Sequence, residues 1–197
     1  MQRRLALAAF SATVLAAALA GCGQDKPPFQ SVDVTGADYA KDIRLPDADG
    51  KPRSLQDFRG KLVVVFFGYT QCPDVCPTAL NDLAEVKRQL GPDGDKLQGV
   101  FVTVDPERDT PQVLKAYMAN FDPGFVALRG TPEELAKVAQ DFKVYYKKVE
   151  GKAPGTYTMD HSAAHLVYDT QGRLRLYVRP GAGPKVLAED LKLLLKS

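Results

Sequence analysis

Residues 61–80 read KLVVVFFGYTQCPDVCPTAL, an apolar run that ends at two cysteines and is followed by a helical pattern. The run is rich in β-branched and aromatic residues, and its length and flanking turn signals predict a strand buried on both faces. From Thr78 to Leu90, apolar residues recur at the spacing of one helix face. Cys72 and Cys76 therefore lie between a buried strand and its helix, at the sheet edge where α/β proteins form their sites.

The rest of the chain extends this pattern into an α/β domain. The apolar stretch Leu97–Asp105 predicts a second central strand, and the order strand, helix, strand predicts a right-handed parallel crossover. The other expected elements are a hairpin around DADG in Asp42–Leu55, a helical turn at LQDFRGK, helices from Pro111 and from Pro132, a short extended piece at FVALRG, a strand over Phe142–Glu150, a hairpin over His165–Val178 and a helix from Pro184 to Leu195. This plan predicts a thioredoxin-like fold, with a central mixed sheet flanked by helices and an N-terminal hairpin.

The first 21 residues differ in character from the rest of the chain. A short basic segment, MQRR, precedes the uncharged stretch LALAAFSATVLAAALA, and Gly21-Cys22 follows. This layout is typical of a secretory signal, and the ending Leu-Ala-Gly-Cys resembles a bacterial lipoprotein signal in which Cys22 is lipidated. An ordinary cleaved signal or a short uncleaved anchor would share most of these features. We expect a signal peptide over 1–21, a tether over 22–35 and one domain over 36–197, anchored by lipid on the outer, periplasmic side of the bacterial cytoplasmic membrane.

The charge pattern argues against a nucleic-acid-binding role. Arg3 and Arg4 are the only charged residues before Cys22, so the remaining chain balances its 24 acidic residues with an equal number of basic ones. A protein that binds nucleic acid needs clustered Lys and Arg. The pair Lys147-Lys148 is typical of solvated surface, and no nucleic-acid partner is expected.

Two cysteines remain once Cys22 is assigned to lipid, and their chemistry is open at this point. A disulfide between Cys72 and Cys76 would constrain the unfolded chain little, because the loop it closes is short, which argues against a purely structural role. Residues four apart in a helical segment rise about 6 Å, so the pair can form a redox disulfide or hold a soft metal ion such as Cu(I) or Zn²⁺. The two histidines, His161 and His165, lie in one segment, TMDHSAAHLVYD, and offer a third ligand.

Two prolines shape the cysteine loop. Pro73 and Pro77 each disfavour helical geometry in the residue before them, so we expect the helix to start at Cys76 or Pro77. Both sulfurs would then lie near the positive end of the helix, which favours the thiolate. Asp74, between the cysteines, acts in the opposite direction.

Three blocks of the sequence resemble the Sco/SenC family, which is named for synthesis of cytochrome c oxidase. They are FFGYTQCPDVCP, VDPERDTP and TMDHSAAHLVYDTQG, in the family's order, and the resemblance extends from about Ala40 to the C-terminus. It implies a thioredoxin-like domain that binds copper, as Cu(I) or Cu(II), through Cys72, Cys76 and the histidine of Asp-His-Ser, which is His161. It also implies a role in assembling the binuclear copper site of cytochrome c oxidase subunit II.

The resemblance leaves two classes of function open. The first is a copper metallochaperone, and the second is a thiol-disulfide oxidoreductase that uses Cys72 and Cys76 as its catalytic pair to keep the oxidase cysteines reduced. Another periplasmic copper donor and a thioredoxin-like reductant would be further partners. A peroxidase-like thiol enzyme of the same fold fits least, because it needs an activated peroxidatic cysteine. The segment MDHSAAHL contains no proline, whereas ordinary thioredoxins place a cis-proline there. This difference favours a metal-binding role over that of a general dithiol enzyme.

The three blocks contain other polar residues that could lie near the ligands. His165 falls where relatives usually have an apolar or aromatic residue, and in a regular strand it would lie about 13 Å beyond His161, too far to share its ion. The carboxylates expected around the ligands are those of Asp74, Asp105 and Asp160. Asp105 ends the strand beside the cysteine-bearing one, although helix entry through Thr110 and Pro111 accounts for most of that block.

Overall fold

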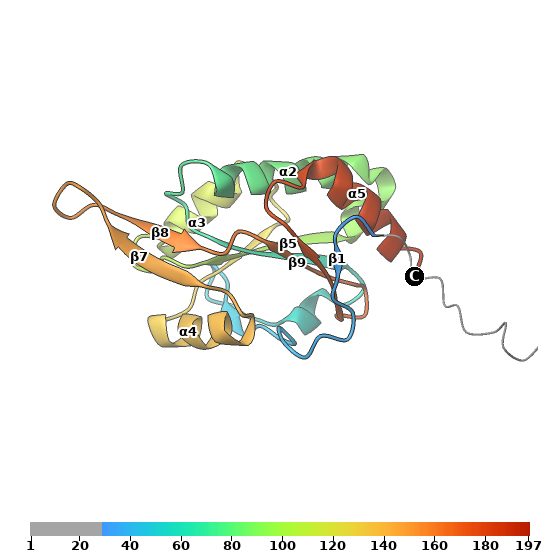
Figure 1. Ribbon diagram of the computed structural model, residues 1–197, viewed down its shortest axis with the longest axis horizontal. Coiled ribbons are helices and arrows are strands. Elements are labelled where there is room, and N and C mark those ends of the chain that lie inside the picture. Colours follow the sequence, from blue (N-terminus) through green and yellow to red (C-terminus); the bar gives the residue numbers. More distant parts are fainter. Residues whose placement is uncertain (1–28) are drawn as a thin grey trace, which may run out of the picture.

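A computed structural model describes residues 29–197 of the chain, and a twisted central sheet runs through them (Figure 1). In this part of the chain the main sheet has six strands in the order β1-β10-β9-β4-β5-β6. These strands are β1 Val32–Asp33, β4 Leu62–Gly68, β5 Leu97–Thr103, β6 Val126–Leu128, β9 His165–Tyr168 and β10 Leu174–Val178. The sheet is mixed, because β4, β5 and β6 are parallel while β9 runs antiparallel to β4.

The centre of the sheet is the strand predicted from the apolar run. All seven residues of β4 are buried, and they pair with the seven residues of β5 from Leu62↔Leu97 to Gly68↔Thr103. On its other edge β4 pairs with β9, which brings Phe66 opposite His165. A strand between two neighbours and two covered faces has no solvent-facing side, which explains its continuous apolar sequence.

Helices cover both faces of the sheet. The helices are α2 Val75–Gln89, α3 Pro111–Met118, α4 Pro132–Asp141 and α5 Gly183–Leu194, with the 3-10 turns η1 Leu55–Phe58 and η2 Gly91–Lys96. Figure 1 shows α2 and α5 together on one side of the sheet and α4 on the opposite side. Thr110 and Thr131 cap α3 and α4 through side-chain bonds to backbone N–H groups, as the Thr-Pro pairs predict.

Two small hairpins lie outside the main sheet. The predicted N-terminal hairpin pairs β2 Leu45–Pro46 with β3 Pro52–Arg53. A second hairpin pairs β7 Tyr146–Glu150 with β8 Tyr157–His161, and Figure 1 shows it projecting from the body of the domain. We expected a strand near β7, but its partner β8 is not among the expected elements.

Most of the predicted plan is confirmed, and the differences are the unexpected strands β1 and β8 and shifts of element boundaries. The α/β architecture, the β4–α2–β5 crossover and the β9–β10 hairpin all occur where they were expected. Val32 and Asp33, inside the segment expected to be a tether, form the edge strand β1 against β10. The signal peptide, Cys22 and the first part of that tether lie outside the described residues.

Candidate metal centre

The cysteine loop joins the end of β4 to the first turn of α2. The helix starts at Val75, earlier than expected, and its first bond runs from the Thr78 N–H to the Asp74 carbonyl. Pro77 lies in this first turn, where helix N–H groups have no intrahelical partner, so its missing N–H costs nothing. The expected start at Cys76 or Pro77 is therefore wrong, and Cys76 belongs to the helix.

Gly68, the last residue of β4, makes room for the buried thiol. A Cβ built on Gly68 would come within 2.8 Å of Cys76 Sγ and of a ring carbon of Phe101. Glycine is required here by close approach and not by an unusual backbone angle. Cys76 has no exposed surface, while Cys72, in the loop above, is 8% exposed.

The third member of the site comes from the hairpin that the sequence did not predict. His161 is the last residue of β8 and pairs with Tyr146 of β7. The Ser162 N–H donates to the Tyr145 carbonyl, and the Tyr145 N–H donates to Ser162 Oγ, which fixes the chain directly after His161. The His161 ring meets the ring of Tyr69, in the cysteine loop, edge to face at 5.7 Å.

Two thiols and one imidazole thus converge. Nε2 of His161 lies 3.3 Å from Cys76 Sγ, and the ligand atoms of Cys72, Cys76 and His161 all lie within 4.8 Å of one another. Protein thiolates and imidazoles bind metals such as zinc at about 2.0–2.3 Å, so atoms this close can share one ion. Two sulfurs and a nitrogen are a soft donor set, which suits Cu(I) or Zn²⁺.

Burial sets the protonation of this group. It raises the pKa of the Cys76 thiol well above its usual range, and the neighbouring Cys72 adds to the effect. The helix terminus was expected to favour the thiolate, but the loss of solvent outweighs it at Cys76. Burial also lowers the pKa of His161, so at neutral pH the ring is uncharged and keeps a lone pair for a metal. The two cysteines are free thiols in this structure.

Asp109 holds the chain that precedes the thiols, a role that the sequence does not predict. Its buried carboxylate accepts bonds from the Thr70 N–H at 3.1 Å and from the hydroxyls of Thr70 and Thr103 at 2.5 Å. Burial raises the pKa of Asp109, and these bonds oppose the rise. Because Thr103 ends β5, the network fastens the cysteine loop to the neighbouring strand.

Arg108 is a second residue whose role the sequence does not predict, and it joins the two halves of the site. Its Nη1 donates to Gln71 Oε1 at 3.1 Å, next to Cys72, and to the Tyr157 carbonyl at 3.0 Å, on the strand that carries His161. The guanidinium also lies over the Tyr157 ring, 3.6 Å from its centroid. One side chain therefore links the cysteine loop to the histidine hairpin. The VDPERDTP block contained both Arg108 and Asp109, but its letters alone give no indication of these contacts.

The three carboxylates expected around the ligands have different places. Asp105 pairs with Arg108 and accepts a bond from the Tyr157 hydroxyl at 2.9 Å, so it acts through Arg108 and not through the thiols. Asp160 is exposed, although its charge raises the pKa of His161 and so partly offsets the effect of burial. Asp74 precedes α2 without capping it and faces a pocket beside the site.

His165 is not part of this group. It starts β9, is 8% exposed, and stacks on Phe66 with ring centroids 5.1 Å apart. Burial lowers the pKa of His165 to about 4. Ser162–Ala164 separate β8 from β9, so the two histidines do not share one regular strand.

Comparison with known proteins agrees with these features. The family model described as SCO1/SenC matches residues 32–196. The chain belongs to the SCO1/SenC family. It is 36% identical over 152 residues to a SCO2-like protein of Rickettsia felis, covering 77% of this chain and 74% of that protein.

Solved members of the SCO1/SenC family share the fold of this chain. A copper-bound ScoI structure from Bradyrhizobium japonicum matches with a TM-score of 0.70 and 44% identity, over 78% of this chain and 97% of that one. Copper-bound yeast Sco1 matches with a TM-score of 0.71 and 28% identity, over 86% and 90%. The predicted thioredoxin-like fold is thereby confirmed. Between residues 29 and 197, no helix has the length and apolar character to cross a membrane.

Proposed function

We propose that this SCO1/SenC member binds one copper ion through Cys72, Cys76 and His161 and serves as a copper metallochaperone. The observation that carries the proposal is the convergence of two thiols and one imidazole within 4.8 Å. Thiolate sulfur and imidazole nitrogen suit Cu(I), and three protein ligands leave an open position for a ligand from an acceptor. Copper in the structures of the Bradyrhizobium and yeast relatives supports the choice of metal.

The acceptor in this proposal is cytochrome c oxidase subunit II, whose binuclear copper site needs metal and reduced cysteines. The Sco family is a family of cytochrome c oxidase assembly proteins, which supports this class of partner. Another periplasmic copper donor would load the chain, and a thioredoxin-like reductant would keep its thiols reduced. In this proposal the copper is transferred as Cu(I), the oxidation state that soft thiolate ligands favour.

A thiol-disulfide oxidoreductase is the second candidate, because both cysteines are free and adjacent. In that role Cys72 and Cys76 give up two electrons and two protons to a disulfide of the acceptor, and they become a disulfide themselves. We expect replacement of His161 to weaken copper binding while disulfide exchange largely persists. Replacing His161 therefore separates the two candidates.

Copper titration of the reduced protein tests the proposal. Wild type should bind one Cu(I) ion, and Cys72→Ser and Cys76→Ser should each lose tight binding, because each removes a thiolate. His161→Ala should bind more weakly while retaining disulfide exchange. His165→Phe is the matched control for a histidine outside the group, and it should bind copper like wild type. Tight Cu(I) binding by a folded variant lacking both cysteines would contradict the site.

We further propose that lipid on Cys22 anchors the domain at the periplasmic side of the cytoplasmic membrane. The basis is the Leu-Ala-Gly-Cys ending after a basic and then apolar leader, with 1–21 removed and residues from 22 forming the start of the tether. In cells fed labelled fatty acid, the wild-type protein should carry label and Cys22→Ser should not. Wild-type protein without label would contradict the anchor.

A further inference from the structure

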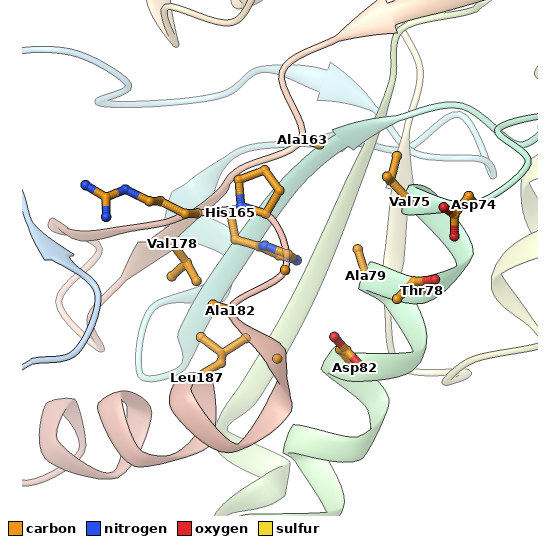
Figure 2. Close-up of a pocket in the computed structure, with 14 residues that line it drawn as sticks. Asp74, Val75, Thr78, Ala79, Asp82, Ala163, His165, Val178, Ala182 and Leu187 are labelled. Atoms are coloured by element: carbon orange, nitrogen blue, oxygen red, sulfur yellow. The ribbon is translucent and has the colours of Figure 1, made fainter.

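A pocket of about 200 Å³ is lined in part by residues that are close in sequence to the proposed ligands, namely Asp74 and Val75 between the two cysteines and Ala163 after His161 (Figure 2). One wall is the first half of α2, and the other is the loop between β10 and α5, with the start of β9 below. The apolar part of the lining comes from Val75, Ala79, Ala163, Val178 and Leu187. The cavity is smaller than the roughly 300–1,000 Å³ typical of drug-sized ligands, so it suits a single side chain.

His165 is an unusual part of this lining. It is only 8% exposed, its Nδ1 is shielded from solvent without a hydrogen-bond partner, and no hydrogen bond to its ring occurs within residues 29–197. Figure 2 shows its ring extending across the pocket toward Ala79 of α2. A buried polar ring without a partner is costly, and buried side chains of this kind normally have one. The ring therefore indicates a ligand that can hydrogen-bond inside the pocket.

Two carboxylates belong to the lining of this pocket, one just before α2 and one within the helix. Asp74 and Asp82 line the pocket, and Figure 2 shows Asp82 on the side of the helix that faces His165. Neither carboxylate has a side-chain hydrogen bond or ion pair with another described residue. Asp82 is partly buried, and this burial raises its pKa. A cation held nearby would compensate for the lost solvent.

The charges of the lining favour a cation over an anion. Arg179 is the basic residue of the rim, but it is exposed and makes no ion pair with either carboxylate. The N-terminus of α5, at Gly183, would suit an anion through its free N–H groups. Two carboxylates against one guanidinium leave the pocket negative, and burial keeps His165 neutral at physiological pH.

We propose that this pocket receives a lysine or arginine side chain from a protein that docks over the thiol and imidazole group. The aliphatic stem of such a residue packs on Val75, Ala79, Val178 and Leu187, and its cationic head reaches Asp82 and the His165 ring. Long basic side chains bury their stems on apolar surface in this way while keeping the head among polar groups. The occupant is a partner's side chain, because the space is too small for most free cofactors and is open at its rim.

The position of the pocket connects it to the proposed function. Val75, between the two cysteines, is 44% exposed at the rim, and Ala163 follows His161 by two residues. A protein whose basic side chain filled the pocket would cover both segments that carry the ligands. The inference rests on the proposed function only for the identity of that partner, and the pocket itself can be tested without copper.

The test follows amide chemical shifts of the reduced, metal-free, ¹⁵N-labelled protein during titration with a blocked Gly-Lys-Gly peptide. Saturable shifts should appear at Ala79, Val178 and Leu187. A blocked Gly-norleucine-Gly peptide, which has the same stem without charge, and n-butylammonium, which has the charge without a backbone, should both bind more weakly. Asp82→Asn should weaken binding of the lysine peptide about fivefold, the upper end for partly exposed ion pairs. Asp95→Asn, on η2 away from the pocket, is the control and should have no effect.

The titrations would overturn the proposal if they gave no saturable shift at the pocket or equal binding of the norleucine peptide. Equal binding of n-butylammonium would also overturn it, because the pocket would then be a site for free amines. An unchanged affinity in Asp82→Asn would overturn it as well. Copper titration of the same Asp82→Asn protein keeps the two questions apart. A protein that binds no copper can still bind the lysine peptide in the pocket, and a protein that binds copper normally can fail to bind the peptide.

Discussion

His165 makes the stability of this protein depend on pH in a way that one substitution should remove. Its ring is almost fully buried, stacks on Phe66 at 5.1 Å and has no hydrogen-bond partner for Nδ1. A proton on this ring would place an unpaired charge in the interior. His165→Phe keeps an aromatic ring over Phe66 but cannot be protonated.

The size of the effect follows from the pKa. Burial lowers it from 6.5 to about 4, so the folded protein resists a proton that the unfolded chain accepts. A depressed pKa contributes stability that is fully present above the unfolded value and is lost as the pH falls toward the folded value. A shift of about 2.5 units corresponds to about 3 kcal/mol in total, of which about 2 kcal/mol should be lost between pH 7 and pH 5.

The assay is denaturant unfolding of reduced wild type and His165→Phe at pH 7, 6 and 5. Wild type should lose about 2 kcal/mol more of its unfolding free energy across this range than the variant. Other groups with shifted pKa values, such as Asp109 and His161, are present in both proteins, so the difference isolates His165. His165→Leu serves the same purpose if phenylalanine does not fit. A difference below about 0.5 kcal/mol would show that burial does not control this ring, and the reasoning would be refuted.

Three further substitutions test the supports of the site. Gly68→Ala should destabilise the fold by about 1–3 kcal/mol in denaturant unfolding, because its new Cβ meets Cys76 Sγ at 2.8 Å; unchanged stability would mean that the core can adjust freely. Asp109→Ala should lower the free energy of unfolding by about 2–4 kcal/mol in the same assay, because the buried donors of Thr70 and Thr103 lose their acceptor. A decrease of less than about 1 kcal/mol would argue against a stabilising role for this network. A lysine in place of Arg108 cannot both hydrogen-bond to the cysteine loop and stack on Tyr157 of the hairpin. In a Cu(I) competition assay, Arg108→Lys should therefore bind copper more weakly than the surface control Arg88→Lys. Equal copper affinities of the two variants would show that Arg108 does not position the ligands.

The parts of the fold that the sequence predicts are those with local signals. β4 can be predicted because a strand buried on both faces needs a continuous apolar sequence. The starts of α3 and α4 can be predicted because Thr-Pro pairs mark them. β8 has no such signal. Its five residues alternate between less and more exposed side chains, but the run is short and only Met159 is buried, so the pattern is a weak signal for a strand. The histidine hairpin is therefore easily missed in the sequence, although it carries one member of the site.

The site itself divides in the same way. Cys72 and Cys76 are found from their spacing after a buried strand, and His161 is found from its resemblance to a family block. Arg108 could not be found, because its partners lie 37 and 49 residues away and meet only after the hairpin folds over the sheet edge. Pocket-lining Asp82 is likewise an ordinary polar residue of a helix until the loop before α5 packs beside it.

The side chains of the thiol and imidazole group differ in how far they are buried. Cys76 has no exposed surface and is held by the close approach of Gly68, so it fixes the geometry and its thiol stays protonated. His161 is the partly exposed member, and it comes from the projecting hairpin. Cys72 is 8% exposed, so we expect an ion or acceptor to approach the group past His161 and Cys72. Asp74 and Val75, between the two cysteines, and Ala163, two residues after His161, line the pocket beside α2, so the segments that carry the ligands also contribute to the proposed contact for a partner.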